Sequence, residues 1–171
     1  MTKKHTGGIL MAKTVLSTFN SKESAERAVA ELRARGFDRE ISIVAREDVA
    51  RQGGRTAAGP TMGTDPVTDG TATGGVLGGL AGLIAGAGAL AIPGIGPIVA
   101  AGPLAGLLSG AATGGIAGGL IDWGIPAERG RYFEEKVKQG NILVSVRCDD
   151  HKANDAATVL RQFGGQDVET H

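Results

Sequence analysis

The sequence has few aromatic residues, a single cysteine and no net charge, and each shortage excludes a class of protein. Its 171 residues include four Phe, one Tyr and one Trp, which excludes a large aromatic core. One cysteine cannot form an internal disulfide, and this fits a cytoplasmic protein. With 18 basic and 18 acidic side chains the formal charge is zero. We therefore expect no overall field that attracts nucleic acid, and no nucleic-acid partner.

Charged residues are also absent from 70–121, and this gap divides the chain into two charged halves. In the first half, the β-branched residues of 13–19 and 41–46 predict two strands. Between them, Asn20 or Ser21 is expected to cap a helix that ends at Gly36. The first half therefore predicts a strand, a helix and a strand.

The second half predicts the same order after one additional helix. Pro126 stands where the first turn of a helix tolerates proline, and that helix is expected to stop at Gly140. The segment 141–148 has the strongest strand pattern in the chain. A helix over 149–165 and a short last strand at 166–170 follow it.

Two strand–helix–strand units favour an α+β fold, specifically a ferredoxin-like α/β sandwich with a four-stranded antiparallel sheet. In that fold a short hairpin joins the second and third strands, whereas here a long insertion takes its place. The expected segments are an N-terminal extension (1–12), the first half of the α/β domain (13–46), a flexible linker (47–72), a helical hairpin (73–121) and the second half of the domain (122–171).

Glycine recurs at every fourth position in two blocks of the uncharged segment. Each interior helical glycine costs about 1 kcal/mol relative to alanine, so close packing of helix backbones has to compensate. We expect two helical arms, 73–91 and 103–121, joined by a turn at Pro93-Gly94 and Gly96-Pro97. The glycine stripe winds around each helix, which favours several neighbours and hence a homo-oligomer. The predicted self-association residues are Gly74, Gly78, Gly82, Gly86, Gly102, Gly106, Gly110, Gly114 and Gly118.

The arms have the length of a membrane span but few strongly apolar residues. A helix over either arm is about 28 Å long, close to the bilayer core of about 30 Å. Arginines on both sides of the segment favour a cytoplasmic location for both ends. We therefore expect association with the inner membrane from its cytoplasmic face, with a soluble cytoplasmic assembly as the alternative. Trp123 is either an interfacial anchor or a core residue that joins the insert to the α/β domain.

No catalytic, cofactor-binding or metal-binding residue is predicted. Cys148 ends a strand and is interpreted as a small apolar residue. Asp149 and Asp150 precede a helix, where capping and the helix dipole explain them. No glycine cluster has the spacing of a phosphate-binding loop. The histidines are isolated and are expected on the surface, at His5, His151 and His171.

Three segments carry a resemblance to a known family. They are "MAKTVLSTFNSKESAERAVAELRARGF", "ALAIPGIGPIVAAGPLAGLLSGAATGG" and "GIPAERGRYFEEKVKQGNILVSVRCDD". Together they resemble the bacterial general stress protein family of heat- or low-temperature-induced proteins, over about residues 11 to 165. The resemblance implies a stress-associated protein, often described as membrane-associated, and implies no catalytic residues.

The function expected from these observations is that of a non-enzymatic general stress protein. It would associate with itself through a glycine-zipper hairpin at the membrane. The alternatives are a soluble self-assembling scaffold that forms a filament or a shell, and a regulatory domain that senses a small ligand. The last of these rests on fold analogy alone.

Overall fold

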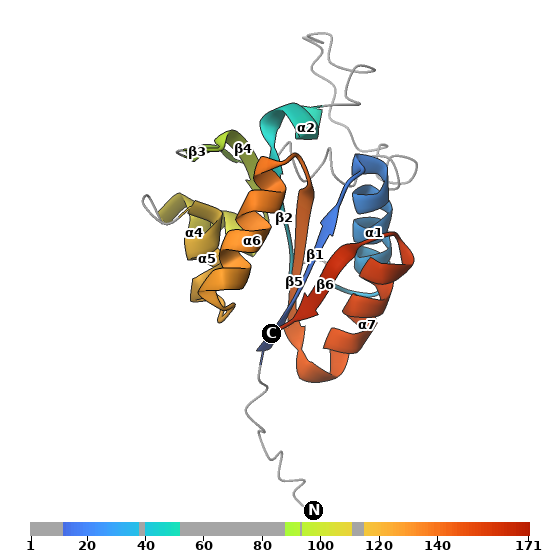
Figure 1. Cartoon of the computed structure of the whole chain (residues 1–171). Helices are drawn as coiled ribbons and strands as arrows, with labels where there is room; N and C mark the ends of the chain where they lie inside the picture. The colour runs from blue at the N-terminus through green and yellow to red at the C-terminus, as the bar shows by residue number, and fades with distance from the viewer. Residues whose placement is uncertain (1–11, 38–39, 52–87, 93, 111–114) are drawn as a thin grey trace, which may run out of the picture.

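A six-stranded antiparallel sheet forms the centre of the computed structural model, with helices on both of its faces (Figure 1). The structure describes residues 12–37, 40–51, 88–92, 94–110 and 115–171. The strand order across the sheet is β3-β4-β2-β5-β1-β6. The predicted α+β class is confirmed.

The first half of the chain forms the elements that its sequence predicts. They are β1 (Ala12–Phe19), α1 (Lys22–Ala34) and β2 (Ile41–Arg46). Ser21 is the N-cap of α1, because its side chain accepts a hydrogen bond from the backbone N–H of Ser24. A short helix that the sequence analysis missed, α2 (Glu47–Arg51), follows β2 within the expected linker.

The second half also agrees with the prediction, with boundaries shifted by a few residues. It contains α6 (Ala127–Lys138), β5 (Ile142–Asp149), α7 (Asp150–Gln162) and β6 (Gln166–Thr170). Pro126 precedes α6 as its N-cap residue. Asp149 has the corresponding position before α7, but its side chain makes no capping hydrogen bond.

The described part of the insertion differs from the predicted pair of long helices. It consists of β3 (Gly88–Ile92), β4 (Gly96–Ala101), α4 (Pro103–Gly110) and α5 (Gly115–Asp122), which we call the insert layer. Residues 73–87 of the first arm lie outside the described residues. The last residues of that arm form a strand, and the second arm contains two helices instead of one.

The physical reason is that β2 offers an edge to which the insertion can add strands. β4 pairs with β2 in a continuous antiparallel register from Ile43 opposite Ala101 to Arg46 opposite Ile98. β3 then pairs with β4. A turn lies in the predicted region, where Ile95 donates a backbone hydrogen bond to the carbonyl of Ile92, but Gly96 and Pro97 of the predicted turn are the first residues of β4. Pro93 lies outside the described residues. The turn therefore joins two strands, not two helices.

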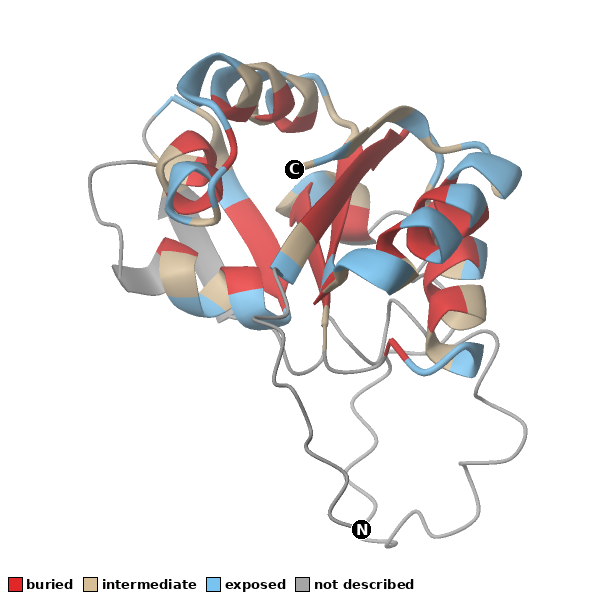
Figure 2. Cartoon of the chain, turned by 90° about the horizontal axis from the view of Figure 1, so that it is seen from below, coloured by how far each residue is buried: buried red, intermediate tan, exposed pale blue. Residues whose placement is uncertain are grey.

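Each face of the sheet packs against its own set of helices, so the protein has two apolar cores (Figure 2). Helices α1 and α7 cover one face, where Phe19, Val29 and Leu160 are fully buried. Helices α4, α5 and α6 cover the other face. The largest buried side chains of that second core are Leu16, Ile98, Leu104, Ile116, Leu120, Ile125, Phe133 and Leu143.

Side chains from the two charged halves bind the N-termini of the insert helices. The backbone N–H of Leu104, in the first turn of α4, donates to Oγ of Ser42 on β2 at 2.9 Å. The backbone N–H of Ala117, in the first turn of α5, donates to Oε2 of Glu134 on α6 at 2.8 Å. Because the first N–H groups of a helix have no partner within it, these contacts satisfy donors at the ends of both helices.

We predict that Glu134→Ala destabilises the protein by about 1–2 kcal/mol, because it removes a charge-assisted cap from α5. The matched control is Glu135→Ala in the same helix, since the side chain of Glu135 is more than half exposed and forms an exposed ion pair with Lys138. Its expected effect is below about 0.5 kcal/mol. Urea denaturation measures both. Equal losses in the two variants would show that the cap is unimportant.

Candidate functional site

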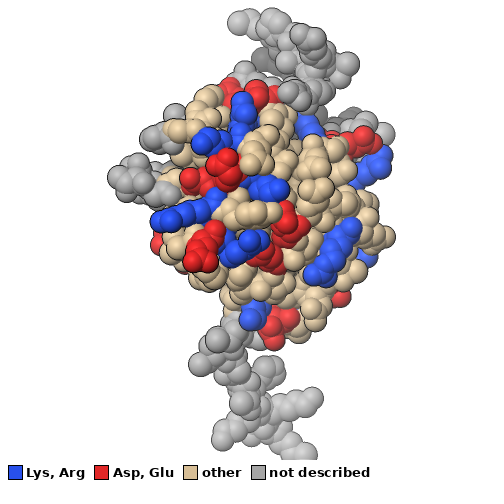
Figure 3. Space-filling view, in the orientation of Figure 1, with Lys and Arg blue, Asp and Glu red and all other residues tan. Residues whose placement is uncertain are grey.

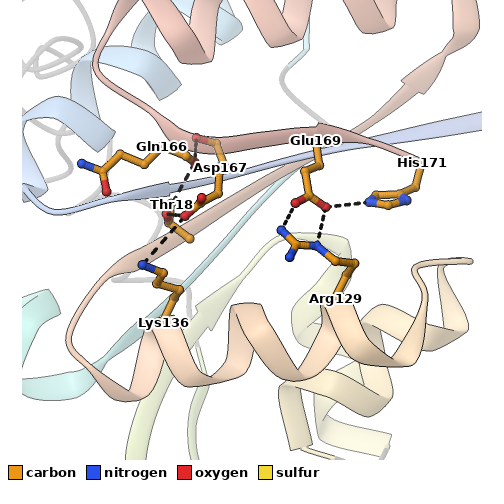
Figure 4. A network of polar contacts seen from close by, with 8 residues as sticks. Thr18, Arg129, Lys136, Gln166, Asp167, Glu169 and His171 are labelled. Carbon is orange, nitrogen blue, oxygen red and sulfur yellow. Dashed lines mark hydrogen bonds and ion pairs between the residues drawn. The ribbon is translucent and has the colours of Figure 1, made fainter.

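A cluster of charged side chains lies between α6 and the edge strand β6 (Figure 4). Nε of Arg129 donates to Oε2 of Glu169 at 2.9 Å, and NH2 of Arg129 also contacts the Oε1 atom of the same carboxylate. The Arg129 guanidinium lies 4.3 Å from the centre of the Tyr132 ring. Nε2 of His171 lies 3.0 Å from Oε2 of Glu169. Glu169 is thus shared between an arginine and a histidine.

A second group of contacts continues the cluster along β6. Oγ1 of the buried Thr18 donates to Oδ2 of Asp167 at 3.3 Å. The Nζ atom of Lys136 lies 4.0 Å from that same Oδ2 atom. Asp167 has φ 52°, in the left-handed region that few residues other than glycine occupy. The register of β6 against β1 shifts between Leu16 and Thr18, so Asp167 lies at an irregularity of the strand.

The cluster holds β6 against α6 and leaves no charged member without an opposite charge. Both carboxylates are engaged by cations, and burial together with the positive charges of Arg129 and Lys13 lowers the pKa of His171. Basic and acidic side chains are interspersed over the face of the molecule that Figure 3 shows. This arrangement is typical of a structural ion-pair network, because a general acid or base needs a group that is free to exchange a proton.

Five of the nine predicted self-association glycines, Gly74, Gly78, Gly82, Gly86 and Gly114, lie outside the described residues. Gly110 is the last residue of α4. Gly102 has φ +87°, and a Cβ atom there would overlap the carbonyl oxygen of Ile41. Gly102 is therefore a turn residue that lets the backbone approach β2, not a member of a helical stripe.

Gly106 and Gly118 differ from Gly102, because a Cβ atom added at either would meet no atom within 4 Å. Gly106 is exposed and Gly118 is half-buried. Three residues after Gly118 is Ile121, a large hydrophobic side chain that is 45% exposed. Among the described residues, no atom of another helix lies close to where a Cβ of Gly118 would be, so no close helix packing compensates the low helix propensity of Gly118 there.

Two other glycines, which the sequence analysis did not single out, mediate the close packing of helices. A Cβ at Gly119 would lie 3.0 Å from Leu108 of α4, and a Cβ at Gly130 would lie 3.1 Å from the Ala117 carbonyl oxygen. Gly119 therefore lets α5 approach α4, and Gly130 lets α6 approach α5. The signal for Gly130 was available in the sequence, since it is a glycine inside an otherwise strong helix pattern.

Trp123 is half-buried and packs against the second core, directly after α5. The Arg147 guanidinium of β5 lies 5.7 Å from the centre of its ring. Of the two predicted roles, the contacts favour a residue that joins the insert layer to the α/β domain.

The interpretation of Cys148 as a small apolar residue is confirmed. It is 4% exposed within the first core. Burial, with a smaller contribution from the carboxylates of Glu40 and Asp149, raises the pKa of its thiol to about 11. The thiolate that acts as a nucleophile or a metal ligand is therefore scarce at neutral pH.

The two described histidines, His151 and His171, lie in different surroundings, and His5 lies outside the described residues. His151 is exposed, and His171 belongs to the charged cluster. No group of three His, Cys, Asp or Glu side chains among the described residues is arranged to hold a metal ion. The longest described helices, α1 and α7, have 13 residues each. None of the described helices combines the length and the apolar character needed to cross a membrane.

Comparison of the chain with protein-family models, with curated proteins and with solved structures found no match.

Adding a side chain is expected to have opposite effects on stability at the two kinds of helical glycine. Gly130→Leu should destabilise the protein by about 1–3 kcal/mol, because α5 and α6 must separate to admit it. Gly118→Ala should stabilise the monomer by up to about 1 kcal/mol, because its Cβ would meet no described atom of its own chain. Urea denaturation of both variants checks this. A tolerated Gly130→Leu would mean that α5 does not pack on α6 as described.

Removing the charge of Glu169 tests the contribution of the charged cluster. Glu169→Gln is expected to cost about 1 kcal/mol, because Arg129 loses a partly buried charge-assisted contact. Glu23→Gln is the control, since the Glu23–Arg27 pair is 64–70% exposed and should contribute less than about 0.5 kcal/mol. The two unfolding midpoints are compared at low ionic strength. If the charged cluster did not contribute to stability, the two variants would have the same unfolding midpoint.

Proposed function

We propose that the α/β part of this protein is a ferredoxin-like sandwich into which the insert layer has been added. The order β2-β5-β1-β6 of its four strands, all antiparallel, supports this. So does the position of α1 and α7, which each connect two of these strands and pack on one face. The insert layer lies between the second and third of these strands in the chain, and it extends the sheet beyond β2.

We further propose that the protein is a non-enzymatic structural protein that associates with itself through the insert layer. The observation that carries this proposal is the outer surface of α4 and α5. There α5 carries Gly118, where an added Cβ would meet no described atom, and the exposed Ile121, in a layer that has no charged residue before Asp122. Gly118 and Ile121 are three residues apart and so share a face of the helix, and small and apolar residues on an uncharged surface favour contact with another protein surface.

The contrast between glycines supports this proposal. Gly119 and Gly130 permit contacts inside the chain, so their cost in helix propensity is offset there. Gly118 costs about 1 kcal/mol relative to alanine, and among the described residues no atom lies where its Cβ would be. A second copy packed against this side of α5 would supply a close neighbour. The resemblance to general stress proteins adds the proposal that this association serves a stress response.

The proposal of a non-enzymatic role has separate support. The thiol of Cys148 is buried with a raised pKa, and the charged side chains between α6 and β6 neutralise one another. Neither location offers a reactive group beside an open space for a substrate.

Sedimentation velocity of the full chain, over a range of concentrations and without detergent, tests the proposed function. We expect species heavier than the 17.3 kDa monomer. Gly118→Glu should weaken the association about tenfold or more, because it introduces a charge into an apolar contact while its Cβ meets nothing within the monomer. Asn154→Asp, which adds one negative charge on the exposed side of α7, should leave the association unchanged.

Two results would overturn the proposed function. The first is a wild-type chain that stays monomeric at every concentration. The second is a chain that sediments as a monomer but floats with vesicles of phosphatidylethanolamine and phosphatidylglycerol, which would assign the uncharged surface to lipid. Membrane association, which the lengths of the two arms predict, stays a prediction until that flotation is measured.

A further inference from the structure

The two edge strands of the sheet are protected to very different degrees. An edge strand presents unpaired backbone groups, and proteins prevent its pairing with other chains by placing charges and irregularities along it. β6 has both, since it carries Asp167 and Glu169 and its register against β1 is interrupted. β3 consists of Gly, Ala, Leu, Ala and Ile, with no charge and a continuous register.

The backbone hydrogen bonds determine which groups of β3 point outward. The N–H of Arg147 donates to the carbonyl of Glu40. The backbone N–H and C=O groups of the even-numbered residues of β2 therefore point toward β5, and those of the odd-numbered residues point toward β4. From the register of β4 against β2, the backbone N–H and C=O groups of Val99 and Ala101 point toward β2. Those of Ile98 and Ala100 point toward β3.

The same alternation continues to the edge of the sheet. Gly88, Leu90 and Ile92 direct their N–H and C=O groups toward β4, and Ala89 and Ala91 direct theirs away from it. Pro97 agrees with this assignment, because it lies opposite Ala91 and has no N–H to donate. Among the described strands only β4 pairs with β3, so the hydrogen-bonding groups of β3 without a partner in the described sheet belong to Ala89 and Ala91.

We propose that β3 pairs with β3 of a second copy of this chain, antiparallel and about a two-fold axis at Leu90. In this register Ala89 of one copy lies opposite Ala91 of the other. Each such pair exchanges two backbone hydrogen bonds, so both outward-facing residues of both copies are satisfied. A shift by two residues toward the C-terminus would place Ala89 opposite Pro93, which has no N–H to donate.

Charge favours a second copy of β3 as the occupant of this edge. Two uncharged strands meet without repulsion, and an antiparallel pair about a two-fold axis is complementary to itself. The same arrangement of two β6 strands would place Asp167 opposite Glu169 of the other copy, and like charges opposite each other destabilise a sheet. The sequence therefore permits self-pairing at one edge of the sheet and opposes it at the other.

This inference rests on the proposed self-association and assigns it a second surface. The outer face of α4 and α5 and the edge of β3 are separate parts of the insert layer. Two different self-complementary contacts on one chain link copies into an extended assembly instead of a closed dimer. This would distinguish a filament-forming scaffold from a simple dimer.

Proline substitution tests the pairing, because proline removes the N–H group of the residue that it replaces and is tolerated on an edge strand where that N–H faces outward. Ala89→Pro and Ala91→Pro each leave the ladder between β3 and β4 intact and remove two hydrogen bonds per paired dimer. We expect each variant to weaken the pairing about tenfold or more in sedimentation velocity. Urea denaturation should show that the fold of each variant is retained. Neither variant should alter the contact that Gly118→Glu disrupts.

Disulfide cross-linking of the full chain tests the register itself. In the proposed pair Leu90 lies opposite Leu90 of the second copy at a non-hydrogen-bonded position, with Cα atoms about 4.5 Å apart, which a disulfide can bridge. Leu90→Cys should therefore form a covalent dimer under mild oxidation. Ala91→Cys is the matched control, because its diagonal partner is about 7–8 Å away, too far for an unstrained disulfide. Wild-type protein, with only the buried Cys148, reports the background.

The outcomes separate this inference from the proposed function. Association that Gly118→Glu weakens, but that neither proline variant alters and Leu90→Cys does not trap, would overturn the β3 pairing alone. Faster cross-linking of Ala91→Cys than of Leu90→Cys would overturn the register. A wild-type chain that is monomeric throughout would overturn both.

Discussion

The insert helices depend on hydrogen-bond acceptors that lie outside the uncharged segment. Ser42 of β2 binds the first turn of α4, and Glu134 of α6 binds the first turn of α5. A buried or partly buried helix end without such partners leaves N–H groups unsatisfied, at a cost comparable to the whole contribution of several apolar contacts. The insert layer therefore needs the charged halves on both sides of it in order to fold.

This dependence explains how a segment so rich in glycine becomes ordered. Glycine lowers the stability of an isolated helix, and helices of eight residues such as α4 and α5 are too short to persist alone in water. The sheet compensates by burying Leu104, Ile116 and Leu120 against its second face. The Gly130–Ala117 contact then fixes α5 against α6. Packing, not propensity, stabilises these helices.

The charged halves were predictable because their signals are local. The β-branched run of β2, the Ser21 cap of α1 and the glycine after each helix determine those elements over a few residues. The insertion was not predictable in the same way. A segment of Gly, Ala, Leu and Ile can form either a helix or a strand. Here β4 is a strand because it pairs with β2, which is distant in sequence. The role of each glycine likewise depends on its neighbours in space. Gly102 meets β2, Gly130 meets α5, and Gly118 meets nothing described.

The distribution of charge gives the two ends of the sheet different properties. β6 carries two carboxylates that form ion pairs with Arg129 and Lys136 of α6. These ion pairs hold the strand against α6, and the charges on the strand oppose its pairing with another chain. At β3, the absence of charge leaves the edge open to pairing. The uncharged composition of the insertion thus also leaves β3 without the charges that β6 carries, and this links the fold of the insert layer to the proposed self-association.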